Sequence, residues 1–233
     1  LIKAAIGTKL KLGIGLKHET DKQQLADELH KPYRKPPMLL KVKVFGKDEI
    51  WSCDLVEMPI DNLGRGGKYK YILTVIDLYT RYAWSIPLRD KTGNTVKEAF
   101  EKIFKESSRK PAKLWCDRGK EFYNGVMKKF LKENNIVIYS TYNDGKAVVV
   151  ERFNRTLKQM MWKRFTVQGT QKWFSILPEL VNQYNNKVHR MIKTTPTIAS
   201  KNPDKIKDII HENNYENENK KKRHKFSVGD RVR

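Results

Sequence analysis

The sequence predicts an α/β domain in which a five-stranded mixed sheet carries helices on both faces. Two observations lead to this fold class. Three apolar, strand-like segments follow one another with only turns between them, and further strand-like segments then alternate with segments of helical periodicity. Strands in direct succession, followed by strand–helix alternation, describe a mixed sheet that is covered by helices on both sides.

The five predicted strands come from apolar runs bounded by turns. The first run is apolar on both faces, which is typical of a buried central strand. The second and third are predicted to form a hairpin joined by the turn Leu78–Arg81. In chain order the strands are Glu49–Met58, Tyr69–Asp77, Tyr82–Leu88, Ala112–Asp117 and Ile136–Thr141.

The predicted helices carry apolar residues at helical spacing. Thr92 or Asn94 is expected to cap the first helix, and Pro178 is expected to bend or restart the fourth. The central helix begins at Ala147 with the segment AVVVERFNRTLK. The ranges are Thr95–Ser107, Gly125–Asn134, the helix from Ala147, Thr170–His189 and a short helix that begins at Thr194–Pro196.

Composition divides the chain into four predicted parts. Residues 1–44 form a basic extension or linker with several glycines and prolines, and residues 45–205 form the core domain. Residues 206–224 lose nearly all apolar side chains and end in a run of basic residues, which is typical of a solvated charged linker. Residues 225–233 (KFSVGDRVR) are predicted to be the first strand and turn of a small β module that is truncated here, and they resemble the start of a small β-barrel (SH3-like or chromodomain-like).

The charge balance predicts the kind of partner. Lys and Arg outnumber Asp and Glu by 48 to 26, and the formal net charge is +22. An excess of this size indicates a polyanionic partner, with nucleic acid ahead of a membrane surface. No apolar run approaches the roughly 20 residues needed to span a bilayer. The two cysteines, Cys53 and Cys116, leave no CxxC pair for zinc, so we expect no zinc and a reducing compartment.

Three carboxylates stand out by their positions. Asp54 lies inside an apolar strand, where an unpaired carboxylate is costly unless it has a cation partner or a function. Asp117 ends the fourth strand, at the edge where open α/β sheets carry functional residues. Glu151 follows on the central helix after 33 intervening residues. The three could converge at one edge of the sheet, and such oxygen ligands suit Mg²⁺ or Mn²⁺, of which a pair can promote phosphoryl transfer.

A polar stripe continues from the third carboxylate along the central helix. It consists of Glu151, Asn154, Arg155 and Lys158, at positions i, i+3, i+4 and i+7. One carboxylate flanked by cations suits a metal ion with nucleic-acid phosphate beside it. The alternative is an amphipathic surface helix with an i,i+4 ion pair.

Four segments that occur in one order, DLVEM, VIDLYTRYAW, WCDRGKEFYN and VVERFNRTLK, resemble the catalytic core of retroviral-type integrases. The 33-residue spacing, the segment YSTYNDGKAVVVERFNRTLK and the upstream LADELHKPYRK are most similar to integrases of the Maverick/Polinton DNA transposons. The resemblance covers about residues 45–205. It implies a ribonuclease-H-like fold with a D,D,E triad.

The resemblance also implies roles for individual residues. Asp54, Asp117 and Glu151 match the metal-binding, catalytic carboxylates of the family. Asn154, Arg155 and Lys158 match positions that contact DNA. Lys146 belongs to Tyr142–Lys146, which matches a loop beside the active site, and it is also expected to bind DNA. The implied activity is metal-dependent trimming of a DNA 3′ end followed by strand transfer into a target duplex. It would be carried out by a homo-oligomer in the nucleus.

Two other functions are compatible with the same predicted fold. One is a ribonuclease H, against which the Glu151 helix and its ERFNRTLK continuation argue. The other is a domesticated, catalytically inactive DNA-binding module, against which the intact triad argues.

Several further residues are predicted to be structural. Asp77 is expected to cap the turn that follows it rather than to bind metal. Strand alternation points Cys53 and Cys116 away from the aspartates that follow them, so both are expected to pack in the core. The tryptophans predicted to be core residues are Trp51, Trp84 and Trp115.

Overall fold

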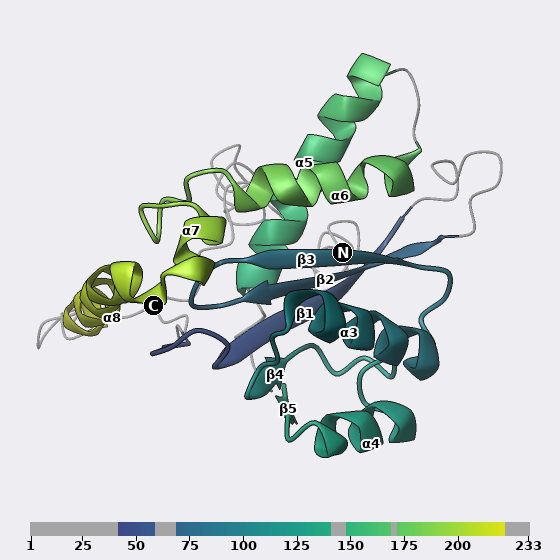
Figure 1. The fold of residues 1–233 in the computed structure, drawn as a ribbon, viewed down its shortest axis with the longest axis horizontal. Coiled ribbons are helices and arrows are strands. Elements are labelled where there is room, and N and C mark those ends of the chain that lie inside the picture. The colour runs from purple at the N-terminus through teal and green to yellow at the C-terminus, as the bar shows by residue number, and fades with distance from the viewer. Residues whose placement is uncertain (1–41, 59–68, 141–147, 169–171, 222–233) are drawn as a thin grey trace, which may run out of the picture. The chain divides into compact units, whose positions relative to one another are not determined.

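A five-stranded mixed sheet lies at the centre of the computed structural model, which describes residues 42–58, 69–140, 148–168 and 172–221 (Figure 1). All of these residues belong to one unit of the chain, Leu40–Arg233. The predicted N-terminal extension up to residue 41 lies outside the described residues, and so does the predicted β-barrel start at 225–233.

The strands lie in the order β3-β2-β1-β4-β5. The β1–β2 and β2–β3 pairs are antiparallel, whereas β4 pairs with β1 and β5 in parallel. The sequence-based prediction of a mixed sheet with a central first strand is therefore confirmed. The strand bounds are β1 Ile50–Glu57, β2 Tyr71–Asp77, β3 Ala83–Leu88, β4 Lys113–Trp115 and β5 Val137–Tyr139.

Strand β1 is apolar on both faces because each face belongs to a different part of the core. Trp51 and Cys53 pack into the cluster on one side of the sheet, and Ile50 and Val56 pack into the cluster on the other. Successive side chains of a strand point to opposite faces. Asp54 therefore shares the face of Ile50 and Val56, and this face determines which helix it meets.

Helices cover both faces of the sheet, as predicted. The helices α3 (Gly93–Ser107) and α4 (Gly125–Glu133) pack on the face of Trp51. The helices α5 (Val148–Gln168) and α6 (Trp173–Asn185) pack on the opposite face. Figure 1 shows the two pairs on either side of the strands. Thr92 is the N-cap of α3, since its side chain accepts a hydrogen bond from the N–H of Thr95.

Two predictions about helices are corrected. Helix α6 does not restart at Pro178, because the apolar side chains on both sides of the proline are buried and hold the helix by packing; they are Ile176, Leu177, Leu180 and Val181. Residues expected to be a charged linker instead form α8 (Lys207–Lys221), after α7 (Pro196–Lys201) and the 3-10 helix Pro203–Ile206. Ile206 and Ile210 are buried in the core and stabilise the start of α8. The prediction of a linker was wrong because it relied on the mostly polar composition of the segment.

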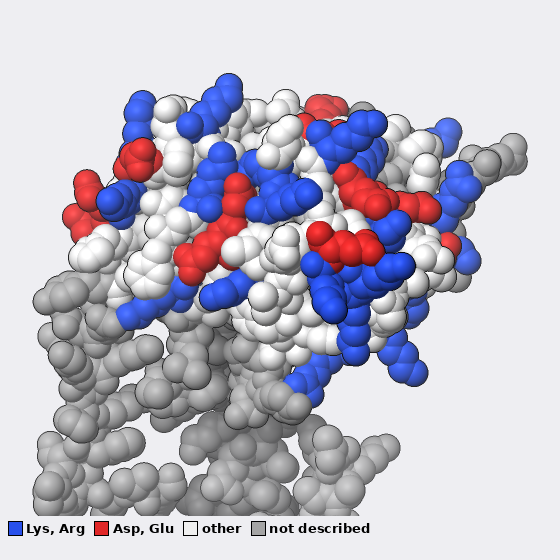
Figure 2. Space-filling view, turned by 60° about the horizontal axis from the view of Figure 1, so that its bottom comes forward, with Lys and Arg blue, Asp and Glu red and all other residues white. Residues whose placement is uncertain are grey.

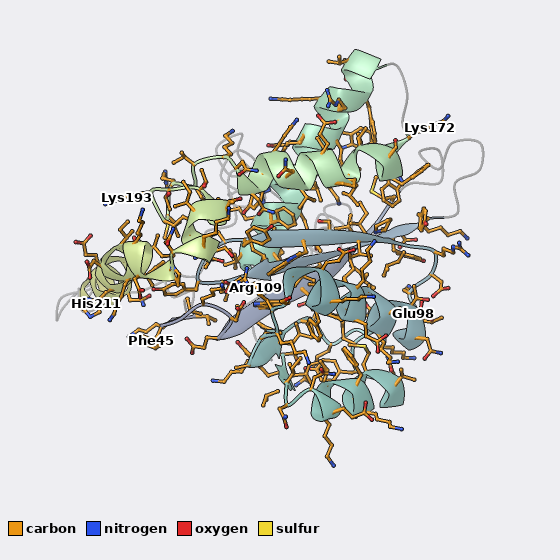
Figure 3. The ribbon with its side chains drawn as sticks, in the orientation of Figure 1. Phe45, Glu98, Arg109, Lys172, Lys193 and His211 are labelled. Atoms are coloured by element: carbon orange, nitrogen blue, oxygen red, sulfur yellow. The ribbon has the colours of Figure 1, made fainter. Side chains whose placement is uncertain are left out.

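Arg109 joins four parts of the domain (Figure 3). Its guanidinium donates to Asp48 before β1, to Asp77 at the end of β2 and to Ser200 on α7. The guanidinium also lies 4.9 Å from the centre of the Trp84 ring. The side chain is only 10% exposed and Asp77 is fully buried, so this is a buried ion pair with its hydrogen-bonding groups satisfied.

Positive charge is spread over one face of the domain (Figure 2). Figure 2 shows Lys and Arg side chains across one face of the domain, with Asp and Glu groups between them. None of the helices within the described ranges is long and apolar enough to cross a bilayer. The charge distribution agrees with a polyanionic partner, but charge alone does not mark one binding site on this face.

Candidate active site

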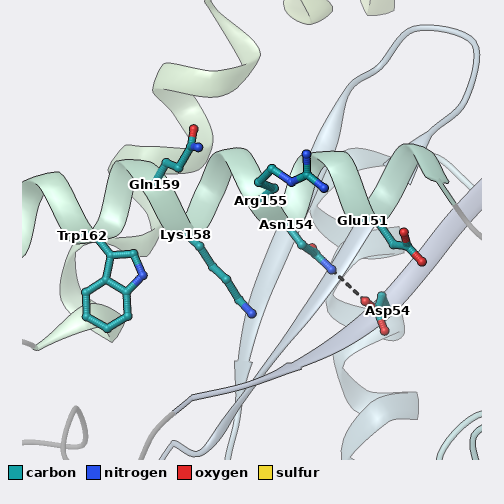
Figure 4. Close-up of a pocket in the computed structure, with 7 residues that line it drawn as sticks. All are labelled: Asp54, Glu151, Asn154, Arg155, Lys158, Gln159 and Trp162. Atoms are coloured by element: carbon teal, nitrogen blue, oxygen red, sulfur yellow. Dashed lines mark hydrogen bonds between the residues drawn. The ribbon is translucent and has the colours of Figure 1, made fainter. Parts of the chain in front are cut away.

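Asp54 lies in the middle of β1, half-buried beneath helix α5. Both of its carboxylate oxygens have donors: Oδ1 accepts from the N–H of Leu55 and Oδ2 from the side-chain amide of Asn154, each at 2.8 Å. Figure 4 shows the bond to Asn154 across the gap between strand and helix. The carboxylate is thus fixed in orientation by its own strand and by α5.

The electrostatic surroundings of Asp54 disfavour its charge. Burial is the main cause that raises the pKa of Asp54, and the negative charges of Asp117 and Glu151 raise it further. The N–H of Leu55 and the positive charge of Lys158 lower the same pKa. The balance leaves a carboxylate that would be stabilised by an additional positive charge nearby.

Glu151 shares a surface groove with Asp54. It is exposed in the first turn of α5, where the helix dipole favours a negative side chain. The groove has a volume of about 440 Å³. Its lining residues are Asp54, Glu151, Asn154, Arg155, Lys158, Gln159 and Trp162 (Figure 4).

Asp117 lies near this groove without lining it. It is exposed, two residues after the end of β4, and its charge is close enough to raise the pKa of Asp54. In the described ranges, no three His, Cys, Asp or Glu side chains form a group that could hold a metal ion. The structure therefore brings Asp54 and Glu151 together as predicted and leaves Asp117 at the margin.

The chemistry of the donors nonetheless fits a hard divalent cation. All three side chains offer carboxylate oxygens, the ligands that Mg²⁺ and Mn²⁺ prefer. The mutual repulsion that raises the pKa of Asp54 is the kind that a bound cation removes. In addition, Oδ1 of Asn154 is buried and has no hydrogen-bond partner in the described part of the chain.

The remaining predicted site residues divide into two groups. Arg155 and Lys158 are exposed and line the groove, as a DNA-contacting role requires. Asn154 also lines the groove, but it is only 7% exposed and its amide binds Asp54. Its contact with DNA stays a prediction. Lys146 lies outside the described residues.

Two residues of the groove, Gln159 and Trp162, were not predicted. Trp162 continues the polar stripe of α5 one turn beyond Lys158, at i+11 from Glu151. The helical spacing could have found it. An aromatic residue, however, is ordinarily assigned to the core stripe of an amphipathic helix.

The residues predicted to be structural are confirmed with one exception: Trp84 is only half-buried against the cluster that contains Trp51. Asp77 accepts hydrogen bonds from the N–H of Tyr79 at 3.2 Å and the hydroxyl of Thr80 at 2.6 Å, and so caps the turn. Cys53 and Cys116 are free thiols and each is 1% exposed. Cys53 lies on β1, and Cys116 directly follows β4, which is the strand paired with β1. Burial, together with a hydrogen bond to Cys116, raises the pKa of Cys53, which makes it a poor nucleophile.

Comparisons with known proteins agree with this fold. Residues 46–141 match the family described as integrase core domain. An uncharacterized transposon-derived protein of Caenorhabditis elegans is 36% identical over 126 residues, which are 54% of this chain and 44% of that protein. The Pol polyprotein of a radiation murine leukemia virus is 29% identical over 131 residues, 55% of this chain and 22% of the polyprotein. The matched region thus spans less than half the length of these curated relatives.

Solved structures show the same architecture at low sequence identity. The HTLV-2 integrase catalytic core domain, solved with magnesium, superposes with a TM-score of 0.55 at 17% identity and covers 65% of this chain and 95% of that one. A chain of the simian T-cell lymphotropic virus intasome gives a TM-score of 0.60 at 16% identity, over 82% of this chain and 68% of that one. The fold is that of integrase catalytic cores, the ribonuclease-H-like fold. Residues 46–141, which are less than half of the chain, match the integrase core domain family.

Proposed function

We propose that this chain is a metal-dependent DNA polynucleotidyl transferase that trims DNA 3′ ends and joins them to a target duplex. The observation that carries the proposal is the shared groove of Asp54 and Glu151, which continues along α5 past Arg155 and Lys158. Two carboxylates followed by two cations suit a reacting phosphodiester at one end and backbone phosphates along the rest.

Each residue has a distinct part in this proposal. Asp54, Asp117 and Glu151 would hold Mg²⁺ or Mn²⁺, which supplies activation of the attacking oxygen and stabilisation of the leaving oxygen. The amide of Asn154 keeps Oδ2 of Asp54 in place. Arg155 and Lys158 bind phosphates and set the register of the strand. The attacking group is water in the trimming step and a 3′-hydroxyl in the joining step.

The relatives support the wider setting of the proposal. The C. elegans relative is described as transposon-derived, and the HTLV-2 core is described in trimeric and dimeric forms with magnesium. We accordingly propose a homo-oligomer that acts on element termini and target DNA in the nucleus. The assignment to Maverick/Polinton elements rests on the sequence motifs and the 33-residue spacing alone.

Metal-dependent cleavage tests the proposed activity. The purified chain is incubated with labelled duplex DNA that ends in a candidate element terminus, with Mn²⁺ or with EDTA. Nicks near the 3′ end, or joined products, are expected only with metal. Glu151→Gln is expected to abolish them, whereas Glu98→Gln, an exposed glutamate of α3 on the other side of the sheet, is expected to leave them unchanged.

One observation favours a second candidate, an inactive DNA-binding module. In the described part of the chain the three carboxylates do not gather closely enough to hold a metal ion. If the chain binds DNA in a salt-dependent manner but yields no metal-dependent product, this second function replaces the first.

A further inference from the structure

Trp162 is the exposed tryptophan of this protein. The chain has five tryptophans, and the structure describes all of them. Trp51, Trp115 and Trp173 are at most 4% exposed and Trp84 is half-buried, but Trp162 is 47% exposed. The indole of Trp162 therefore leaves a large aromatic surface open to a ligand.

The indole packs against one residue of the core. The ring of Phe165 meets it edge-on, with ring centres 5.4 Å apart and an interplanar angle of 86°. Phe165 is itself part of the buried core, at 6% exposure. A rigid aromatic surface loses little conformational freedom when a ligand stacks on it, which is the property of a binding platform.

Trp162 lies at the far end of the groove that begins at the carboxylates. It lines this groove together with Lys158 and Glu151, and Figure 4 shows the indole on the same side of α5 as the Lys158 ammonium and the Asn154 amide. With a helix rise of 1.5 Å per residue, Trp162 is roughly 6 Å beyond Lys158 and roughly 16 Å beyond Glu151.

The order of chemical groups along the groove indicates the class of ligand that it binds. Cations that follow a backbone, combined with an aromatic surface on which a base stacks, are the features that bind single-stranded nucleic acid. In a duplex both faces of an internal base are covered by its neighbours, so an indole cannot stack on such a base until it has left the duplex. We propose that Trp162 is a stacking platform for an unpaired nucleobase of a DNA end whose phosphates lie along Arg155 and Lys158. This inference rests on the proposed function, because it needs DNA in the groove.

DNA binding without catalysis tests the platform. Fluorescence anisotropy in EDTA compares a labelled hairpin that has a fully paired end with the same hairpin carrying a short unpaired end. The wild-type chain is expected to bind the unpaired end more tightly. Trp162→Ala is expected to weaken binding of the unpaired end by about 5- to 150-fold, the range for loss of one base–aromatic stack, and to change the paired end little. Trp162→Phe is expected to retain most of the preference.

Phe45→Ala serves as the matched control. Phe45 is 70% exposed but does not line the groove, so its removal is expected to leave both affinities unchanged. Circular dichroism of each variant verifies that the fold is retained. Quenching of tryptophan fluorescence by the unpaired end, in wild type and not in Trp162→Phe, provides a second readout.

Four results would overturn the inference. Equal affinities of wild type and Trp162→Ala for the unpaired end would show that no base stacks there. An equal loss for both DNA ends would assign Trp162 to a duplex contact. Loss of self-association in Trp162→Ala with an unchanged end preference would assign it to an interface between copies of the chain. A wild-type chain that binds neither DNA would refute the proposed function, and the platform with it.

Discussion

The side-chain amide of Asn154 donates a 2.8 Å hydrogen bond to Oδ2 of Asp54, and this bond links the central strand to the helix of the third carboxylate. Asn154→Ala removes one of the two donors and leaves the Asp54 carboxylate held only by the N–H of Leu55. Loss of a group that orients a metal ligand lowers metal affinity or activity by about 10- to 100-fold. We therefore expect the rate of metal-dependent nicking to fall by this factor, as measured by single-turnover cleavage.

DNA affinity distinguishes this role from a direct contact. In EDTA, Asn154→Ala is expected to bind DNA as the wild type does. Lys158→Ala is the comparison, because loss of one phosphate contact weakens binding and reduces the magnitude of the salt slope by about 1. A parallel loss of nicking and affinity in Asn154→Ala would mean that the amide contacts DNA.

A divalent cation is expected to stabilise the folded chain through Asp54. Burial and the charges of Asp117 and Glu151 raise the pKa of Asp54, so its ionised form opposes folding near neutral pH. A cation that binds only the folded state stabilises it by about 2.7 kcal/mol at 100 times its dissociation constant. Thermal melts of the wild type with Mn²⁺ and with EDTA measure this difference.

Asp54→Asn supplies the control for the cation. The substitution keeps the shape of the side chain and removes the repelled charge, so we expect a higher melting temperature than that of the wild type in EDTA. It also removes a ligand, so Mn²⁺ is expected to shift its melting temperature little. An equal shift in both proteins would place the cation elsewhere.

The fold could be predicted because its signals are local in the sequence. Alternation and apolar runs located β1, β2 and β3, and helical spacing located α3 and α4 within a few residues. The groove could be predicted in part, because Asp54 is anomalous in an apolar strand and Glu151 begins a polar stripe. These signals need no knowledge of tertiary contacts.

The missed features depend on contacts between distant segments. Asn154 has the spacing of an exposed stripe residue, and only the approach of α5 to β1 buries it against Asp54. Arg109 follows α3 with no pattern around it, since its partners come from three other elements. Residues 207–221 have a polar composition, and the two isoleucines that anchor α8 are too few to give a periodic signal.

Of the charged residues, Arg109 is expected to contribute most to the free energy of unfolding. Its removal would leave Asp77 fully buried without its cation, and breaking a buried pair in this way costs about 3–5 kcal/mol. We expect Arg109→Ala to lower the free energy of unfolding by this amount in urea titrations. Arg109→Lys, which keeps the charge but not the fork of donors, is expected to fall between alanine and wild type.

An exposed ion pair provides the matched comparison. Lys97 and Glu101 are 3.2 Å apart on the surface of α3. Lys97→Ala is expected to change stability by about 0.5 kcal/mol or less, as is usual for exposed i,i+4 pairs. Equal losses in Arg109→Ala and Lys97→Ala would show that burial does not strengthen the Arg109 interactions.

His189 is expected to make the fold sensitive to acid. Burial lowers the pKa of His189 to about 4, and the nearby charges of Arg81 and Arg152 act in the same direction. The folded state also requires the neutral ring, because Nδ1 of His189 accepts a hydrogen bond from the N–H of Met191 at 3.3 Å and cannot carry a proton while it does so. In the unfolded chain the same imidazole protonates near its ordinary pKa of about 6.5.

The sign of the effect follows from proton binding. Between about pH 6.5 and about pH 4 the unfolded state binds one more proton at His189 than the folded state does. Stability should therefore be independent of His189 above this window and decrease as the pH falls through it. Urea titrations at a series of pH values, for the wild type and for His189→Asn, isolate this contribution because the other titrating groups are common to both proteins. On acidification the wild type is expected to lose more stability than the variant, and the difference in slope against pH is expected to approach that of one bound proton. Parallel curves would mean that His189 is protonated alike in the folded and unfolded states.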